Sequence, residues 1–142
     1  MRLTQQQKTP EMFLGLFNLS NASFDTDERP PENIFRAHVD TDDVFILVGG
    51  FEDQIAGFAI VTERGGPYIW SLAISKAYRG CGNGKRLLGE VLSYYADASV
   101  NLTCKIDNVA AQVLYLKNGF RVVRVVPRYY GATDGLLMRR IS

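Results

Sequence analysis

The chain has 142 residues, of which 46% are hydrophobic and 22% are charged, a composition typical of a globular protein and not of a disordered or fibrous one. No apolar run approaches the roughly 18 residues that a membrane-spanning helix needs, and residues 1–10 lack the apolar stretch of a secretory signal. The two cysteines, Cys81 and Cys104, and the one histidine, His38, form neither a disulfide framework nor a metal-ligand spacing. We therefore expect a single domain over residues 1–142, in the cytoplasm, with no metal site and no membrane contact.

The formal net charge of +1 conceals a difference between the two halves of the chain. Residues 1–71 carry 5 basic and 11 acidic side chains, a net charge of −6, whereas residues 72–142 carry 11 basic and 4 acidic ones, a net charge of +7. A basic half suits a polyanionic ligand and an acidic half a cationic one, unless the halves interleave in the fold and their charges average out. Because the basic residues are scattered, we do not expect nucleic-acid binding.

The first half of the chain predicts two helices followed by a β-meander. Helical spacing of apolar residues, strand-forming runs and the Gly/Pro-rich stretches between them mark these elements. They are helices over 10–19 and 33–38, a loop over 20–32, and strands over 44–48, 55–61 and 68–75. Gly49, Gly50, Glu52 and Asp53 supply turn residues for a hairpin between the first two strands.

The second half alternates helices and strands. The same signals predict helices over 84–98 and 110–117 and strands over 101–106, 120–126 and 136–141. Asn108 and Gly119 occupy the positions of a helix N-cap and a C′ glycine. Strand, helix, strand across residues 68–106 is a βαβ crossover, which requires a parallel pair of strands. We expect an α+β fold: a mixed sheet with an antiparallel meander, one central parallel pair and helices on both faces.

The strongest chemical signal is a glycine-rich segment between a strand and a helix. It reads Arg79-Gly80-Cys81-Gly82-Asn83-Gly84-Lys85, and its alternate glycines let the backbone approach a ligand closely. The helix that follows presents the positive end of its dipole, so a phosphate group is the expected ligand. The spacing fits neither the nucleotide P-loop nor the dinucleotide fingerprint. A purely structural glycine turn stays open at this point.

This segment resembles the pyrophosphate loop of the GNAT superfamily of N-acetyltransferases, in which Gln or Arg, two residues, Gly, one residue, then Gly or Ala recur. Arg79, Gly82 and Gly84 match that pattern. Twenty-four residues further on, the segment 108–120 resembles the second signature of the family, with Asn108, a small residue, Tyr115 and a closing Gly119-Phe120. The resemblance covers residues 68–142 in sequence and the earlier part mostly in topology.

The resemblance implies acetyl-CoA as the acetyl donor and an amine as the acceptor, either a small molecule or a peptide. In the family, the strand before the loop separates from its neighbour and contacts the pantetheine arm. It thus implies binding of acetyl-CoA by Leu72, Ala73, Ile74, Arg79, Gly80, Cys81, Gly82, Asn83, Gly84, Lys85, Asn108 and Tyr115. Tyr115 would be the acid that protonates the departing thiolate; an ordinary core tyrosine is the alternative.

The general base and the acceptor are less well defined. Many relatives carry a glutamate at the position of Tyr68, and some carry one near Thr103, but neither is a carboxylate here. A water relay, Glu63 or Asp107 remain as alternatives. Tyr129 and Tyr130 are similar to paired tyrosines that grip the peptide backbone in relatives acetylating protein N-termini; an aromatic loop that merely packs is the alternative.

Two further alternatives concern function and assembly. The missing carboxylates favour a GNAT-fold acyl-CoA-binding sensor or interaction module without turnover, whereas the retained Tyr115 favours an enzyme. A polycationic acceptor, drawn to the acidic half, is the alternative to a peptide. The chain is expected to be a monomer or a homodimer.

Overall fold

The computed structural model describes residues 1–49 and 54–142, so three of the predicted turn residues, Gly50, Glu52 and Asp53, lie outside the described residues. The helices are α1 (Pro10–Ser23), α2 (Glu32–Thr41), α3 (Asn83–Tyr94) and α4 (Val109–Lys117), with short 3-10 turns η1 (Gln5–Gln7) and η3 (Lys76–Tyr78). The strands are β1 (Asp43–Gly49), β2 (Gln54–Thr62), β3 (Tyr68–Ile74), β4 (Val100–Lys105), β5 (Arg121–Val126) and β6 (Gly135–Arg140). Among the described helices, none is long and apolar enough to cross a membrane.

Every predicted element is present, with shifted ends. The first two helices run three to four residues past their predicted ends, to Ser23 and Thr41, whereas α3 stops at Tyr94, four residues short of its predicted end. At the start of α1, the Thr9 side chain accepts a hydrogen bond from the Met12 N–H. Differences of this size reflect the weak signals that mark helix ends in a sequence.

The six strands form one mixed sheet in the order β1-β2-β3-β4-β6-β5. The pairs β1–β2, β2–β3, β4–β6 and β5–β6 are antiparallel, and β3–β4 is parallel. The predicted meander, the βαβ crossover through α3 and the central parallel pair are therefore confirmed.

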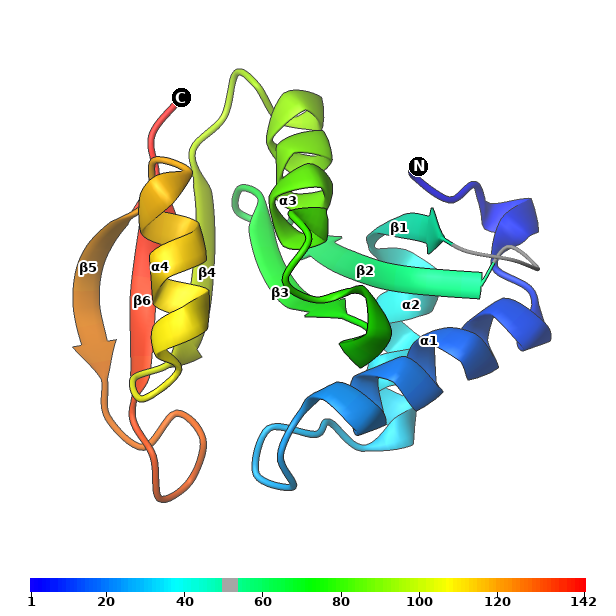
Figure 1. The fold of residues 1–142 in the computed structure, drawn as a ribbon, viewed down its shortest axis with the longest axis horizontal. Helices are drawn as coiled ribbons and strands as arrows, with labels where there is room; N and C mark the ends of the chain where they lie inside the picture. Colours follow the sequence, from blue (N-terminus) through cyan, green and yellow to red (C-terminus); the bar gives the residue numbers. More distant parts are fainter. Residues whose placement is uncertain (50–53) are drawn as a thin grey trace.

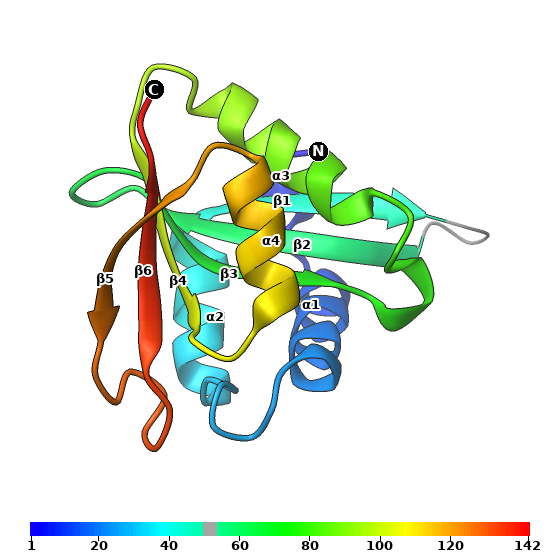
Figure 2. The ribbon, with the colours of Figure 1, turned by 60° about the vertical axis from the view of Figure 1, so that its left-hand side comes forward.

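Helices cover both faces of the sheet (Figures 1 and 2), and each side has its own buried core. On one face, α1 and α2 contribute Phe13, Leu16 and Phe35 to a cluster that includes Phe58 of β2. On the other face, a larger cluster joins side chains of α3 and α4, among them Tyr115, to the inward residues of β1–β4 and β6. Because neighbouring side chains of a strand point to opposite faces, the alternation within β1 and β2 supplies both cores.

The parallel pair is short, and this positions the candidate site. Only Tyr68–Asn101 and Ile69–Leu102 are paired, although β3 continues to Ile74 and β4 to Lys105. Beyond these pairs the two strands draw apart, as Figure 1 shows. Beyond Ile69 and Leu102, the edges of β3 and β4 that face each other therefore have no partner strand among the described residues. The backbone groups along these edges stay available to a ligand.

Candidate active site

The glycine loop, residues 79–85, joins β3 to α3 through η3. Gly80 and Gly82 both have left-handed backbone angles, with φ of +79° and +81°, which favour glycine over residues with a Cβ. Gly82 is the N-cap of α3, and the first helical bond of that turn runs from the Arg86 N–H to the Gly82 carbonyl at 3.0 Å. The amides just before Arg86 have no acceptor inside the helix and lie at the positive end of its dipole.

The chemistry of this loop fits a pyrophosphate. A Cβ placed on Gly80 or on Gly82 would meet no atom within 4 Å, so an anionic group can approach the backbone there. Lys85 and Arg86 are exposed beside the loop and add positive charge. Exposed amides, a helix N-terminus and nearby cations together form the usual environment of a bound phosphate.

Two predicted cofactor residues of the loop, Arg79 and Asn83, also hold it in shape. The Arg79 Nε donates to the Ile74 carbonyl at 2.8 Å and so ties the loop to the end of β3. The Asn83 side chain donates to the Tyr78 carbonyl at 2.9 Å and accepts from Arg86 at 3.3 Å. Cys81 is an exposed free thiol, which differs from the buried or half-buried thiol that is usual for a free cysteine. The other cysteine, Cys104, is free and buried.

The structure brings the loop, the end of β3 and α4 together. A Cβ on Gly84 would lie 3.3 Å from Leu114 of α4 and 3.9 Å from Ile74 of β3. Ile74 and Leu72 pack against the core that contains α3 and α4, whereas Ala73 points into the core on the α1 and α2 side. Asn108 is the N-cap of α4, where its Oδ1 accepts from the Ala111 N–H at 3.1 Å, as its position in the sequence predicts.

Tyr115 lies on α4 and is part of the core that this helix covers. Its side chain is 7% exposed and its ring packs against Phe120, with the ring centroids 5.7 Å apart. Burial, with a smaller contribution from the Cys104 thiol, raises the pKa of Tyr115 well above its ordinary value. The hydroxyl therefore stays protonated at neutral pH, as a proton donor must. Burial likewise raises the pKa of the Cys104 thiol to about 11, so this thiol is not a nucleophile at neutral pH.

On the opposite face of the separated strands, four side chains form what we call the hydroxyl cluster: Tyr68, Thr103, Tyr129 and Tyr130. The Tyr68 hydroxyl donates to the Thr103 Oγ1 at 2.7 Å and lies 3.1 Å from the Tyr129 hydroxyl. The Tyr130 hydroxyl donates to the Thr103 carbonyl at 3.2 Å. Tyr129 and Tyr130 meet edge to face at 4.8 Å, and Tyr129 is 47% exposed.

The hydroxyl cluster brings together residues that the sequence linked to two different roles, the general base and the binding of the acceptor. The GNAT resemblance would place a glutamate at Tyr68 and another near Thr103, and Tyr129 and Tyr130 are the predicted acceptor residues. Burial raises the pKa of Tyr68 and of Tyr130 above the ordinary tyrosine value. These hydroxyls therefore donate and accept hydrogen bonds in neutral form and do not act as bases near pH 7.

A buried lysine at the end of β4 holds the loop between α1 and α2. The Lys105 ammonium lies 2.7 Å from Asp27, 3.5 Å from Asp25 and 3.7 Å from Glu28, and its side chain is only 9% exposed. We call residues 24–31 the acidic loop. The hydrogen bond to Asp27 raises the pKa of Lys105, whereas burial raises the pKa of the Glu28 carboxyl.

The acidic loop also supplies a group of carboxylates. The side chains of Asp25, Asp27 and Glu28 each have an oxygen within 4.8 Å of the others, but the Lys105 ammonium already provides their counter-charge. Sequence reasoning missed this arrangement, because Lys105 is separated from its partners by about 80 residues of chain. The only signal in the sequence was a lysine directly after the alternating apolar residues Val100, Leu102 and Cys104.

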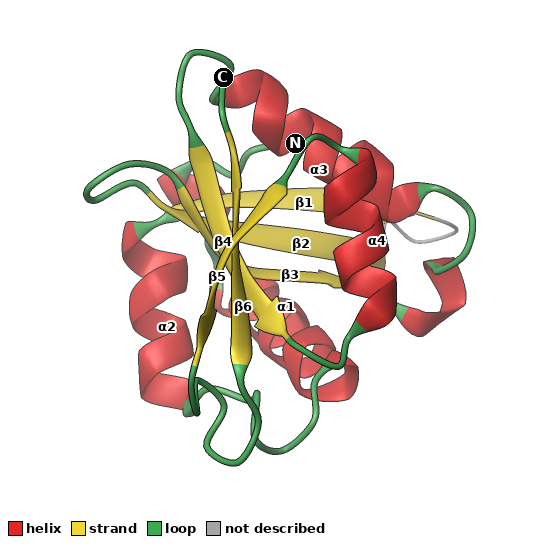
Figure 3. Cartoon of the chain, turned by 90° about the vertical axis from the view of Figure 1, so that its left-hand side faces the viewer, coloured by secondary structure: helices red, strands yellow, loops and turns green. Residues whose placement is uncertain are grey.

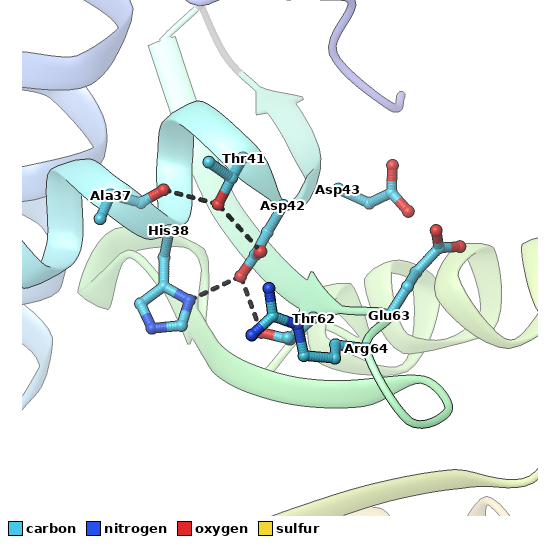
Figure 4. Close-up of a pocket in the computed structure, with 8 residues that line it drawn as sticks. All are labelled: Ala37, His38, Thr41, Asp42, Asp43, Thr62, Glu63 and Arg64. Carbon is cyan, nitrogen blue, oxygen red and sulfur yellow. Dashed lines mark hydrogen bonds and ion pairs between the residues drawn. The ribbon is translucent and has the colours of Figure 1, made fainter.

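A pocket of about 420 Å³ lies elsewhere, where α2 ends and β1 begins (Figure 4). Asp42 is its centre: its carboxylate accepts from Thr62 at 2.7 Å and lies 2.6 Å from the His38 Nδ1. Glu63, one of the candidate bases, lines this pocket beside Asp43, whose carboxylate raises the Glu63 pKa. Since Glu63 follows the end of β2, it lies near the paired beginnings of β3 and β4 and not near their separated ends.

The family comparison agrees with this geometry. A family model described as the acetyltransferase (GNAT) family matches residues 12–120, which is more than half of the chain. The chain belongs to the GNAT family. The family match includes the glycine loop, Asn108 and Tyr115, but not Tyr129 and Tyr130.

Individual relatives are similar over part of their length. An N-alpha-acetyltransferase RimI of Mycobacterium tuberculosis is 38% identical over 76 residues, which are 52% of this chain and 48% of that protein. A [ribosomal protein bS18]-alanine N-acetyltransferase of Haemophilus influenzae is 36% identical over 87 residues, which are 58% of this chain and 59% of the relative. The chain spans 26% to 62% of the length of the curated relatives it matches.

Solved structures agree in fold. A chain of the NatC complex bound to Gag peptide and CoA superposes with a TM-score of 0.83 at 21% identity, covering 100% of this chain and 98% of the other. At this level of identity the likeness shows the fold alone. The predicted α+β GNAT fold is thereby confirmed.

Proposed function

We propose that the protein is an N-acetyltransferase that moves an acetyl group from acetyl-CoA to the free α-amine of a polypeptide. One observation carries the proposal: β3 and β4 separate after Ile69 and Leu102. The separation leaves the glycine loop and Tyr115 on one face of the sheet and the hydroxyl cluster on the other. A donor and an acceptor can then meet between the two strands from opposite sides.

On the donor side, acetyl-CoA would supply the acetyl group as a thioester. The backbone amides of the glycine loop would bind its pyrophosphate at the N-terminus of α3. The unpaired edge of Leu72–Ile74 would bind the pantetheine arm as a further strand binds a sheet, through backbone hydrogen bonds. Much of the rate enhancement of such a site comes from holding two reactants in attacking geometry.

Tyr115 is the proposed acid. Its hydroxyl is neutral at physiological pH because burial raises its pKa, so it holds the proton that the departing sulfur needs. No hydrogen bond from this hydroxyl to another described residue is present, whereas the Tyr68 and Tyr130 hydroxyls both have partners. The Tyr115 proton is therefore available to a ligand.

On the acceptor side, the hydroxyl cluster and the names of the relatives support a polypeptide. The two relatives are named for acetylating an α-amine and an alanine of a ribosomal protein. Tyr129 and Tyr130 lie near the unpaired edge of β4, because the Tyr129 hydroxyl lies 3.1 Å from the Tyr68 hydroxyl and the Tyr130 hydroxyl donates to the Thr103 carbonyl. An extended peptide backbone bound at this edge could form hydrogen bonds with the same groups. An α-amine, with a pKa near 8, requires less of a base than a lysine with a pKa near 10.4.

The proposal is tested by measuring thiol release from acetyl-CoA with a panel of acceptors. The panel contains short peptides with a free N-terminus, the same peptides with a blocked N-terminus, lysine-containing peptides and spermidine. We expect turnover with the free peptides and its loss on blocking, even where a lysine is present. Binding of acetyl-CoA without turnover on any amine would instead support the sensor module. Preference for spermidine would refute the polypeptide acceptor.

A further inference from the structure

We call the sheet face that carries the hydroxyl cluster the acceptor face, and a row of three arginines lies on this face beyond the cluster. In β4 and β6, Leu102, Cys104 and Leu136 point into the core under α4, so Asn101, Thr103, Leu137 and Arg139 point to the opposite face. Register extends that face to β5, because Arg121 pairs with Arg139 and Arg124 pairs with Leu137. We call Arg121, Arg124 and Arg139 the arginine row.

The hydroxyl cluster lies on this same face. Thr103 pairs with Leu137, which in turn pairs with Arg124, so these three side chains stand side by side across three strands. A Cβ on Gly135 would meet both Thr103 and Tyr129 at 2.8 Å, which places Tyr129 over the same face of β6. Figure 3 shows α4 on the other side of the three strands.

The arginine row can bind a negatively charged group. Its three side chains are exposed, and among the described residues no carboxylate lies within ion-pair distance of any of them. Two of the guanidinium groups contact neutral oxygens instead: Arg121 donates to the Phe120 carbonyl at 2.9 Å, and Arg139 donates to the Asn101 side chain at 2.8 Å. Each arginine retains several N–H donors for a carboxylate, which guanidinium groups bind in a bidentate manner.

On the other side of the hydroxyl cluster lies the acidic loop, held at the end of β4 by Lys105. Its three carboxylates lie around the Lys105 ammonium, and Arg29 is the only other cation of the loop, so a negative charge remains there. The acceptor face therefore changes sign from the acidic loop, where the strands separate, to the arginine row on β5 and β6. A ligand with a positive group at one end and negative groups further along would complement both ends.

We propose that the arginine row binds acidic side chains that follow the N-terminus of the acceptor, so that the preferred substrates are polypeptides with acidic N-terminal segments. This inference rests on the proposed function, since it assumes an α-amine at the separated strands. Neighbouring strands lie about 4.8 Å apart, so β5 is about 10 Å from β4. An extended peptide advances about 3.3 Å per residue, so its third and fourth residues reach the arginine row.

The same features disfavour two other ligands. A polycationic acceptor would be repelled by three unpaired arginines along its path. A nucleic acid would contact the arginines but would then meet the carboxylates of the acidic loop on the same face. An acidic peptide with a free ammonium group matches both charges.

The test compares three peptides that share a free N-terminal serine and differ only at residues 2–4, which are acidic, neutral or basic. At low salt we expect KM for the acidic peptide to be at least about tenfold below that for the basic one, with similar kcat, because the contact is the same in the ground and transition states. The difference should shrink as ionic strength rises. In the double variant Arg121→Gln/Arg124→Gln the three KM values should converge.

Lys117→Gln serves as a control for the loss of surface charge: it removes one exposed positive charge from α4, against two in the double variant, and should leave the preference intact. Equal KM values for the three peptides in the wild type would overturn the inference while leaving the proposed function standing. Acetylation of none of them, with turnover on another amine, would overturn both. If single-stranded RNA binds and the double variant abolishes this binding while peptide kinetics stay equal, the arginine row is a nucleic-acid surface and the inference is wrong.

Discussion

Substitution of Gly82 by alanine separates a role in cofactor binding from a role in folding, because the chain contains a matched control. Gly82 and Gly65 have φ angles of +81° and +77°, and a Cβ on either would meet no atom within 4 Å. Gly82 lies in the glycine loop, whereas Gly65 lies in the turn between β2 and β3, at the opposite end of β3. Both alanine variants therefore impose the same backbone strain and no clash.

Because the two glycines have the same backbone conformation, the losses of stability and of acetyl-CoA affinity in the two variants can be compared directly. A left-handed conformation costs a residue with a Cβ about 1–2 kcal/mol. For a domain of this size that lowers the melting temperature by about 3–6 °C, and we expect similar losses for Gly65→Ala and Gly82→Ala. Only Gly82→Ala should weaken acetyl-CoA binding, by at least about tenfold or about 1.4 kcal/mol, because its Cβ occupies the approach to the loop amides.

Calorimetric titration with acetyl-CoA, well below both melting temperatures, measures the difference. Wild-type affinity in a folded Gly82→Ala protein would refute the assignment of the pyrophosphate to this loop. An equal loss of affinity in Gly65→Ala would show that general destabilisation, and not local contact, is responsible. Gly84→Val is a less clean test, since a Cβ at Gly84 would lie only 3.3 Å from Leu114 and would disturb packing.

Two further predictions concern the acid and the acidic loop. Tyr115→Phe removes the hydroxyl and keeps the ring, so acetyl-CoA affinity should stay near wild type while kcat falls by about 10²-fold; full activity would make Tyr115 a core tyrosine only. Because burial raises the Tyr115 pKa, steady-state rates of the wild type should show no loss of this acid up to about pH 10. Lys105→Met leaves the carboxylates of the acidic loop without their ammonium, so we expect a melting temperature a few degrees lower and faster cleavage after Glu28 by a glutamate-specific protease. Lys105→Arg should restore both, and an unchanged cleavage rate in Lys105→Met would show that the loop does not depend on this ion pair.

Local patterns were sufficient to predict the elements and the positions of the residues that we assign to the donor side. The glycine loop, the cap at Asn108 and the position of Tyr115 on its helix are all encoded within short segments. In such segments, backbone conformation and helix periodicity limit where each side chain can lie. The helix ends were predicted less well, because the residues at the end of α1 and beyond α3 carry no strong stop signal. Whether the predicted residues bind acetyl-CoA remains a prediction, which the Gly82 variant tests.

The acceptor side could not be predicted in the same way. The contact between Tyr68 and Thr103 joins residues 35 apart, that between Tyr68 and Tyr129 joins residues 61 apart, and Lys105 meets Asp27 across 78 residues. Such pairs depend on the strand register and on the placement of β6 beside β4, neither of which the sequence patterns specified. The arginine row is a further example, because Arg121, Arg124 and Arg139 share a face only through the pairing of β5 with β6 and the bulge between Val122 and Arg124.

The sequence by itself therefore determined the kinds of element, the family resemblance and the position of the glycine loop, since these depend on residues within a turn or two of one another. The charge difference between the two halves was also visible, but the sequence left open whether it would average out in the fold. The tertiary structure decided that the halves meet on the acceptor face, with the acidic loop at one end of the hydroxyl cluster and the arginine row at the other. The physical reason is that strand separation and strand register arise from packing the whole sheet between its helices, and these long-range contacts bring distant charges to one surface.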